Sequence, residues 1–235
     1  MKQNVLRSRG NGERISTIVD SKAGPVKFEL PSQYEVISVV GEGAYGVVAQ
    51  GKYKRDGKTV QVAIKKVSRV FSKGHIMTKR ILREIKMLRH LDHCNILGLK
   101  DLLNGPSLTS DEVYIVTELM WGDLARLLRR ARRDPRRSVL SMDVIKTLSR
   151  QLLSALHHMH RANIIHRDLK PQNILIDGEG RPLISDFGLA ASLSSYASMS
   201  NSAFLRGTVS YKAPELFRGI QDGSAVMTPA ADVYS

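Results

Sequence analysis

Two aspartates, a lysine and an asparagine near residue 170 are of types that can transfer a phosphoryl group. Asp168, Lys170 and Asn173 are close neighbours in the chain, and Asp186 follows Asn173 by 13 residues. The Asp168 carboxylate could accept the proton of an attacking hydroxyl, while Lys170 neutralises charge on the transferring group. Oxygens of Asn173 and Asp186 suit Mg2+ ions that bridge phosphates. The pattern predicts phosphoryl transfer from a nucleotide to a hydroxyl.

The strings around these residues are informative only in combination. His166-Arg167-Asp168 and Asp186-Phe187-Gly188 would each be weak signals alone, because three-residue strings occur by chance. Their order, their spacing and the motifs that precede them make the combination specific. The alternative, a chance match in an unrelated α/β protein, is therefore disfavoured.

A glycine-rich stretch upstream predicts a loop that covers phosphates. Gly41, Gly43 and Gly46 lie between two segments with strand character, at about residues 33–40 and 47–53. Glycines let backbone amides approach phosphates without a clash from a Cβ atom. Because no helical pattern follows, we expect a hairpin over the phosphates rather than a dinucleotide-binding turn.

Lys65 lies inside an apolar strand, where an ammonium group is costly unless it has an anionic partner. Phosphates or a carboxylate would supply it. Glu84 lies beside the apolar stripe of a helix expected over residues 78–88. We predict a Lys65–Glu84 pair; the alternative is a surface pair of Glu84 with a basic neighbour one helical turn away.

The strand expected over residues 113–120 predicts where an adenine ring would bind. Backbone groups of Glu118 and Met120 could form hydrogen bonds with the adenine edge. The apolar surroundings of the nucleotide would come from Val40, Val48, Ala63 and Leu175. Plain core packing is the alternative for the last three.

Two helices are expected between this strand and Asp168. The first covers residues 123–133 and ends in arginines, and the second starts near Ser141 and runs through Met159. Three histidines cluster at the end of the second helix. Because no suitable partners accompany them, we interpret them as ordinary helix-end residues rather than metal ligands; they are His157, His158 and His160.

The chain is strongly basic, with 36 Lys and Arg against 22 Asp and Glu and a net charge of +14. Part of this charge lies near the N-terminus, and part in the arginines between Arg129 and Arg137. We interpret these as a basic tail and a solvated face, with an acidic or phosphorylated partner at Arg129–Arg137 as the alternative. Nucleic-acid binding is disfavoured because no aromatic residues interleave with the arginines.

Length and composition allow one domain or two small lobes in 235 residues, 42% of them hydrophobic. Residues 1–33 are expected to form a basic, flexible tail. The single cysteine, Cys94, excludes a disulfide within the chain and fits a reducing compartment, the cytoplasm or also the nucleus. No apolar run approaches the ~20 residues of a membrane helix, and the N-terminus lacks the pattern of a secretory signal.

A serine-rich segment without periodicity follows Gly188, over residues 189–204. It is either a flexible linker or a site of phosphorylation. The second interpretation is favoured by Arg167, whose guanidinium could bind a phosphate on this segment and order it. The candidates are Ser192, Ser194, Ser195, Tyr196, Ser198, Ser200 and Ser202.

Together these residues resemble the eukaryotic protein kinases over about residues 34–235. Lys170 is typical of serine/threonine kinases, and several stretches are similar to the mitogen-activated protein kinases: residues 41–46, 62–67, 82–86, 113–116 and 119–120. The resemblance implies an α+β, two-lobed fold. An antiparallel-sheet small lobe would cover about residues 34–119, and a mainly helical large lobe about residues 120–235.

The resemblance also implies a reaction and partners. Mg-ATP would be the donor, a Ser or Thr hydroxyl of a protein substrate the acceptor, and an upstream kinase a further partner. Thr117 would limit access behind the adenine.

The sequence departs from these kinases in two ways. Ala203-Phe204-Leu205 takes the place of their Thr-x-Tyr activation motif, and Val209 stands where they carry an arginine that helps select proline. Activation by dual phosphorylation and proline-directed specificity are therefore in doubt. The last residues, 232–235, resemble the start of the large lobe's central helix, so we expect a truncated domain. An inactive fragment that acts as a binding or scaffold protein is the alternative function.

Overall fold

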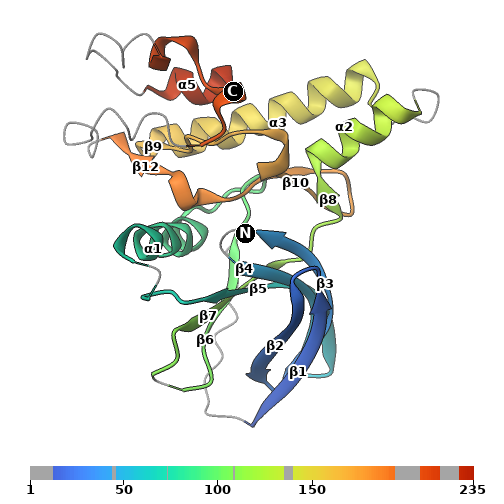
Figure 1. The fold of residues 1–235 in the computed structure, drawn as a ribbon. Helices are drawn as coiled ribbons and strands as arrows, with labels where there is room; N and C mark the ends of the chain where they lie inside the picture. The colour runs from blue at the N-terminus through green and yellow to red at the C-terminus, as the bar shows by residue number, and fades with distance from the viewer. Residues whose placement is uncertain are drawn as a thin grey trace. The chain divides into compact units, whose positions relative to one another are not determined.

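A computed structural model describes residues 13–43, 46–72, 74–107, 109–134, 140–193, 207–217 and 228–235. The chain divides into two compact units, whose elements are labelled in Figure 1. The first unit comprises Met1–Ile85 and Gly98–Leu119, and the second comprises Lys86–Leu97 and Met120–Ser235.

The first unit is built on a five-stranded antiparallel sheet with the strand order β3-β4-β5-β7-β6. Successive side chains of a strand point to opposite faces, so Val62 and Ile64 of one strand reach the same core. The sheet confirms the fold class predicted for the small lobe. Its strands are β3 (Tyr34–Gly43), β4 (Gly46–Arg55), β5 (Lys58–Ser68), β6 (Leu99–Asn104) and β7 (Glu112–Glu118).

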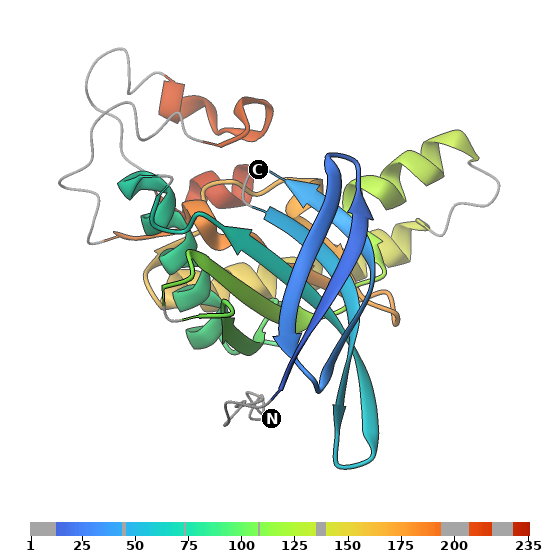
Figure 2. The ribbon, with the colours of Figure 1, turned by 60° about the horizontal axis from the view of Figure 1, so that its bottom comes forward.

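An N-terminal hairpin of β1 (Arg14–Ser21) and β2 (Gly24–Pro31) covers one face of this sheet (Figure 2). The expectation of a flexible tail up to residue 33 is therefore wrong for these strands, whereas residues 1–12 lie outside the described residues. Phe28 and Leu30 provide the physical reason, because both are at most 1% exposed and join the core of the sheet. Burying an apolar side chain of this size contributes about 1.5–3 kcal/mol.

The helix α1 (His75–His90) includes the predicted residues 78–88. The segment after it pairs with β11 (Pro182–Ile184). Nδ2 of Asn95 donates to the carbonyl of Pro182, and the backbone N–H of Leu97 donates to the carbonyl of Ile184, both over 2.9 Å. These bonds explain why Lys86–Leu97 belongs to the second unit, although the sequence placed it in the small lobe.

The second unit contains the helices α2 (Leu124–Arg133), α3 (Met142–Arg161) and α5 (Pro229–Tyr234). Asp123 caps α2 by accepting the backbone N–H of Arg126, and Ser141 caps α3 by accepting that of Val144. Such caps satisfy N–H groups that the first turn of a helix leaves unpaired. Both helix starts agree with the sequence prediction. Among the described residues, no helix is long and apolar enough to cross a membrane.

Short strands and 3-10 turns position the loops that carry the candidate site. The strand β10 (Ile174–Ile176) lies between β11 and β8 (Gly122–Asp123), and β9 (Ile164–Ile165) pairs with β12 (Ala191–Ser192). Asp168 therefore follows β9, and Asp186 follows β11. The 3-10 turns are η2 (Pro171–Asn173), η3 (Phe187–Leu189) and η6 (Val209–Tyr211).

Candidate active site

Lys65 and Glu84 form a close ion pair in the first unit. Nζ of Lys65 lies 2.6 Å from Oε1 and 2.8 Å from Oε2 of Glu84. Lys65 comes from β5 and Glu84 from α1, where its side chain is only 10% exposed. The contact predicted from the sequence is thus present, and the alternative of a surface pair is wrong. The pair fixes the ammonium group of Lys65 on β5.

The glycine-rich stretch forms the end of β3 and the start of β4, as predicted. Gly46 has a φ of +145°, and a Cβ atom there would lie 2.0 Å from the carbonyl oxygen of Lys66. Gly46 is therefore required by close packing against β5. A Cβ atom on Gly43 would have no neighbour within 4 Å, so packing does not explain the glycine at that position.

The sheet register brings most of the predicted nucleotide-binding residues of this unit into adjacent positions. Gly41 pairs with Val48, and Val48 pairs with Lys65. Ala63 pairs with Thr117, and the neighbouring pair joins Val62 to Glu118. Val40 lies on β3 and is half exposed. The other two predicted residues, Met120 and Leu175, belong to the second unit, where Leu175 lies on β10.

Two side chains and one backbone N–H of the second unit hold the carboxylate of Asp168. Oδ2 lies 2.7 Å from Nζ of Lys170 and accepts a longer bond of 3.2 Å from Nδ2 of Asn173. Oδ1 accepts the backbone N–H of Thr208 over 2.8 Å. Nζ of Lys170 also donates to Oγ1 of Thr208 over 2.8 Å. The arrangement fixes a carboxylate and an ammonium group side by side.

Opposing effects set the pKa of Asp168. Burial favours the neutral acid and would raise the pKa, but the hydrogen bonds from Lys170 and Thr208 favour the carboxylate. Together with the charge of Lys170, they hold the pKa of Asp168 below its usual value. Asp168 is consequently an anion at neutral pH.

Asn173 and Asp186 offer oxygen atoms that suit Mg2+. Nδ2 of Asn173 donates to the carbonyl of Asp168 over 2.8 Å, so this bond uses the amide nitrogen and not Oδ1. Asp186 has a left-handed backbone with a φ of +62°. Within the described ranges, no three His, Cys, Asp or Glu residues gather as a metal site. Two protein oxygens nevertheless fit Mg2+, which usually completes its shell with phosphates and water.

Asp232 of α5 anchors the Asp168 loop through hydrogen bonds to its backbone. Oδ2 of Asp232 accepts the backbone N–H of His166 over 2.8 Å, and Oδ1 accepts that of Arg167 over 2.9 Å. Nε2 of His160 lies 3.0 Å from Oδ2. His160 thus belongs to a buried network, rather than being only an ordinary helix-end residue. Asp232 is 3% exposed. The backbone of Arg167, which donates to Asp232, has a φ of +75°.

The family follows from a comparison with known proteins. A family model described as a protein kinase domain matches residues 34–235. The chain belongs to the protein kinase family. Its lysine–glutamate pair and its Asp168 loop are therefore features of a kinase domain, in agreement with the resemblance read from the sequence.

Individual relatives are mitogen-activated protein kinases. Mitogen-activated protein kinase spk1 of Schizosaccharomyces pombe is 38% identical over 236 residues, which covers 98% of this chain and 59% of the relative. Mitogen-activated protein kinase 6 of Oryza sativa is 39% identical over 88% of this chain and 52% of the relative. Mitogen-activated protein kinase 10 of Arabidopsis thaliana is 40% identical over 88% and 49%. The chain thus spans between about half and three fifths of the length of these relatives.

Three residues next to the Asp168 loop were not singled out from the sequence. Besides Asp232 and Thr208, Gly207 has a φ of +102°, and a Cβ atom there would lie 3.0 Å from Oδ1 of Asp168. The sequence gives little indication of these roles, because Gly207-Thr208 matches no distinctive motif. Asp232 could only be recognised as an acidic residue in the first turn of a helix that starts at Pro229. Of the candidate phosphorylation residues, Ser192 lies on β12, whereas those from Ser194 to Ser202, like the Ala203–Leu205 segment, lie outside the described residues.

Two buried cations lie near Asp168 in the kinase domain. Arg167 and Lys212 are each 8% exposed. Burial lowers the pKa of Lys212, and the charge of Arg167 lowers it further, while Asp168 and Asp232 oppose this shift. Two buried carboxylates, those of Asp168 and Asp232, balance the charges of Arg167 and Lys212 in this region.

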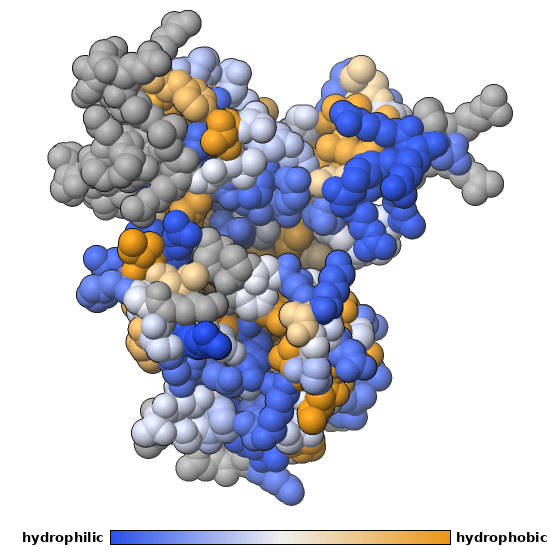
Figure 3. All heavy atoms as spheres, viewed as in Figure 1, coloured by the Kyte–Doolittle hydropathy of each residue, from blue (hydrophilic) through white to orange (hydrophobic). Residues whose placement is uncertain are grey.

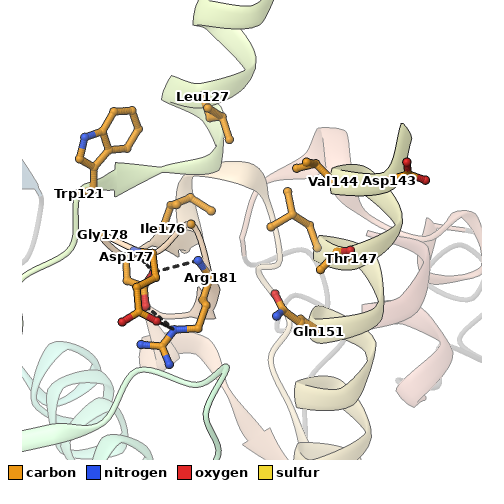
Figure 4. A pocket seen from close by; sticks show the side chains of 13 residues that line it. Trp121, Leu127, Asp143, Val144, Thr147, Gln151, Ile176, Asp177, Gly178 and Arg181 are labelled. Carbon is orange, nitrogen blue, oxygen red and sulfur yellow. Dashed lines mark hydrogen bonds and ion pairs between the residues drawn. The ribbon is translucent and has the colours of Figure 1, made fainter. Parts of the chain in front are cut away.

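A separate cavity of about 670 Å³ lies in the second unit, between α2, α3 and the turn after β10 (Figure 4). Leu127, Val144 and Ile176 give it apolar walls, whereas Asp177 and Arg181 form an ion pair of 2.7 Å at its edge. In the region of α2, a hydrophilic surface lies beside a smaller hydrophobic patch (Figure 3). The exposed arginines of α2 are Arg126, Arg129, Arg130, Arg132 and Arg133.

Proposed function

We propose that the protein transfers the γ-phosphoryl group of ATP to a Ser or Thr hydroxyl of a protein substrate, in signalling. The observation that carries the proposal is the Asp168 carboxylate, held between Lys170, Thr208 and Asn173. A fixed anion beside an ammonium group can orient a hydroxyl and accept its proton while charge on the phosphoryl group is neutralised. Membership of the protein kinase family supports the same reaction.

The chain's own residues take distinct roles in this proposal. Lys65, held by Glu84, binds the phosphates, and the backbone amides of Gly41, Gly43 and Gly46 cover them. The adenine would be bound by the backbone of Glu118 and Met120 and by the apolar side chains Val40, Val48, Ala63 and Leu175. Asp168 accepts the proton of the substrate hydroxyl, and Lys170 stabilises the charge on the transferring group.

Asn173 and Asp186 would hold Mg2+ through their oxygen atoms. The ion, when bound, neutralises phosphate charge and aligns the phosphates for in-line transfer. The structural support is the hydrogen bond from Asn173 to the carbonyl of Asp168, which uses the amide nitrogen and not Oδ1.

An acidic or phosphorylated partner is proposed for the arginine-rich surface of α2, in addition to protein substrates and an upstream kinase. The support is the exposure of its arginines and the position of two guanidinium groups, those of Arg126 and Arg130, within 5.8 Å of the Trp121 ring centroid. Replacing Arg129 and Arg133 by Gln should weaken binding of a phosphoserine peptide, whereas Gln at Arg55 and Lys58 should not. Equal binding by both variants would contradict this proposal.

We place the protein in the cytoplasm or nucleus, consistent with its single, unpaired Cys94.

The proposal is tested by Asp168→Asn, which keeps the size of the side chain and removes its charge. We expect the variant to bind Mg-ATP about as well as the wild type, measured by the rise in melting temperature, and to lose phosphotransfer. Nucleotide at ~100 times its Kd should add about 2.7 kcal/mol to the unfolding free energy of either protein. Retained turnover in the variant would refute the role of Asp168. Binding without turnover in the wild type would favour the alternative of a binding or scaffold protein.

A further inference from the structure

The turn between β1 and β2 is hydrogen-bonded to the glycine-rich stretch. The backbone N–H of Lys22 donates to Oε1 of Glu42 over 2.7 Å. Glu42 stands between Gly41 and Gly43, the two glycines that lead into the turn of the β3–β4 hairpin. The bond joins segments that are 20 residues apart in the chain. The roles proposed above give no task to the β1–β2 hairpin or to Glu42.

The β1–β2 hairpin is itself firmly attached to the sheet. Nζ of Lys66 donates to the carbonyl of Lys27 over 2.6 Å and forms an ion pair with Glu112 at 2.9 Å. The backbone N–H of Glu29 donates to the hydroxyl of Tyr114 over 3.1 Å. Phe28 adds a fully buried ring. Because β2 is anchored on β5 and β7, its turn offers Glu42 a fixed point of attachment.

The local geometry of the turn presents the N–H of Lys22. Oγ of Ser21 donates to the carbonyl of Gly24 over 2.7 Å and accepts the N–H of Ala23 over 3.2 Å. Gly24 takes the positive φ of +116° that closes the hairpin. The hydrogen bonds within the turn thus use Ser21, Ala23 and Gly24, while the N–H of Lys22 is bonded to Glu42.

We propose that Glu42 is a positioning residue, which ties the glycine-rich stretch to the β1–β2 hairpin and pre-organises it for the phosphates of ATP. The inference rests on the proposed function, since it concerns the same nucleotide. A backbone that is already held loses less conformational freedom when the phosphates bind.

Lys22→Pro is the sharpest test, because it removes the N–H donor and leaves the glycine-rich stretch unchanged. Neither Lys22 nor Ala23 has a positive φ, and proline suits the first central position of such a turn. Glu42→Ala removes the acceptor and its charge. Glu42→Gln removes the charge and keeps an acceptor oxygen, and is therefore the matched control.

We expect Lys22→Pro and Glu42→Ala to weaken Mg-ATP binding by about threefold to tenfold, the range of one net hydrogen bond. The KM for ATP should rise by the same factor, with kcat nearly unchanged. Adenosine, which lacks phosphates, should bind equally to all variants. Glu42→Gln should behave like the wild type. Amide hydrogen exchange at Gly41, Glu42 and Gly43 should accelerate in the first two variants only.

Wild-type affinity for Mg-ATP in a folded Lys22→Pro variant, with unchanged exchange at Gly41–Gly43, would overturn the inference. An equal loss of adenosine binding would also overturn it, because the effect would then not concern the phosphates. The proposed function fails differently, through a wild type that binds no Mg-ATP. In that case faster exchange in Lys22→Pro would still reveal the attachment, but its proposed role in nucleotide binding would fall.

Discussion

The backbone N–H of His166 donates to the carboxylate of Asp232 over 2.8 Å, although 66 residues separate them in the chain. The same carboxylate holds the backbone of Arg167, so one side chain fixes the two peptide groups that precede Asp168. His166 in turn places Nε2 2.9 Å from the carbonyl of Ser185, next to Asp186. The two acidic residues of the proposed reaction are therefore positioned by one connected network.

Replacing Asp232 by Ala should destabilise the protein by about 2–5 kcal/mol, because the two buried N–H groups of His166 and Arg167 would lose their acceptor. Chemical denaturation measures this change. Glu179→Ala is the matched control, since its side chain is 76% exposed and should contribute little. Similar losses in both variants would show that Asp232 does not support the loop.

Lys65 and Lys66 are adjacent lysines whose replacement by Met should have different effects. Lys65→Met removes the cation held by Glu84 and should lower kcat/KM by on the order of 10². Lys66→Met breaks the bonds to Lys27 and Glu112 and should lower stability by about 1–3 kcal/mol, with a far smaller effect on kcat/KM. Steady-state kinetics and denaturation of both variants provide the measurement. An equal kinetic loss would contradict the specific role of Lys65.

Gly43→Ala and Gly46→Ala should separate a binding role from a packing role. Gly46→Ala places a Cβ atom against the carbonyl of Lys66 and should cost more than 1 kcal/mol of stability, about the scale of a strained backbone. Gly43→Ala meets no neighbour and should keep the melting temperature while raising the KM for ATP. A stable Gly46→Ala variant would contradict the packing argument.

Acid should destabilise the protein partly through Asp168. In the folded protein the pKa of Asp168 lies below its usual 3.8. The ionised side chain therefore stabilises the fold above pH 3.8. This contribution is lost as the pH falls through the pKa of Asp168 in the folded protein. Lys170→Met removes an opposite charge, so burial should then raise the pKa of Asp168. We expect the acid limbs of stability and of kcat/KM to move to higher pH in Lys170→Met. Unfolding and kinetics measured between about pH 3 and pH 7 test this, and unchanged limbs would contradict it.

Local signals in the sequence predicted the elements that local physics determines. Ser141 and Asp123 cap the helices that were expected after them, and the glycine-rich stretch lies between two strands. The Lys65–Glu84 contact was also predictable, because a lysine on an apolar strand needs an anion. In each case the decisive residues are close in the chain or are constrained by charge.

Long-range packing accounts for what the sequence did not predict. The alternation of Val26, Phe28 and Leu30 indicates a strand, but the polar residues around it favoured a tail. Only the sheet that receives Phe28 and Leu30 makes the hairpin favourable. Asp232 and Gly207 likewise acquire their roles from the Asp168 loop, which lies far away in the sequence.

The most direct test of the proposed function is transfer of labelled γ-phosphate from ATP to peptides that differ only in carrying Ser, Thr or Tyr as acceptor. We predict Mg2+-dependent labelling of the Ser and Thr peptides by the wild type, no labelling of the Tyr peptide, and none by Asp168→Asn. Labelling no higher in the wild type than in Asp168→Asn, or labelling of the Tyr peptide alone, would contradict the proposal.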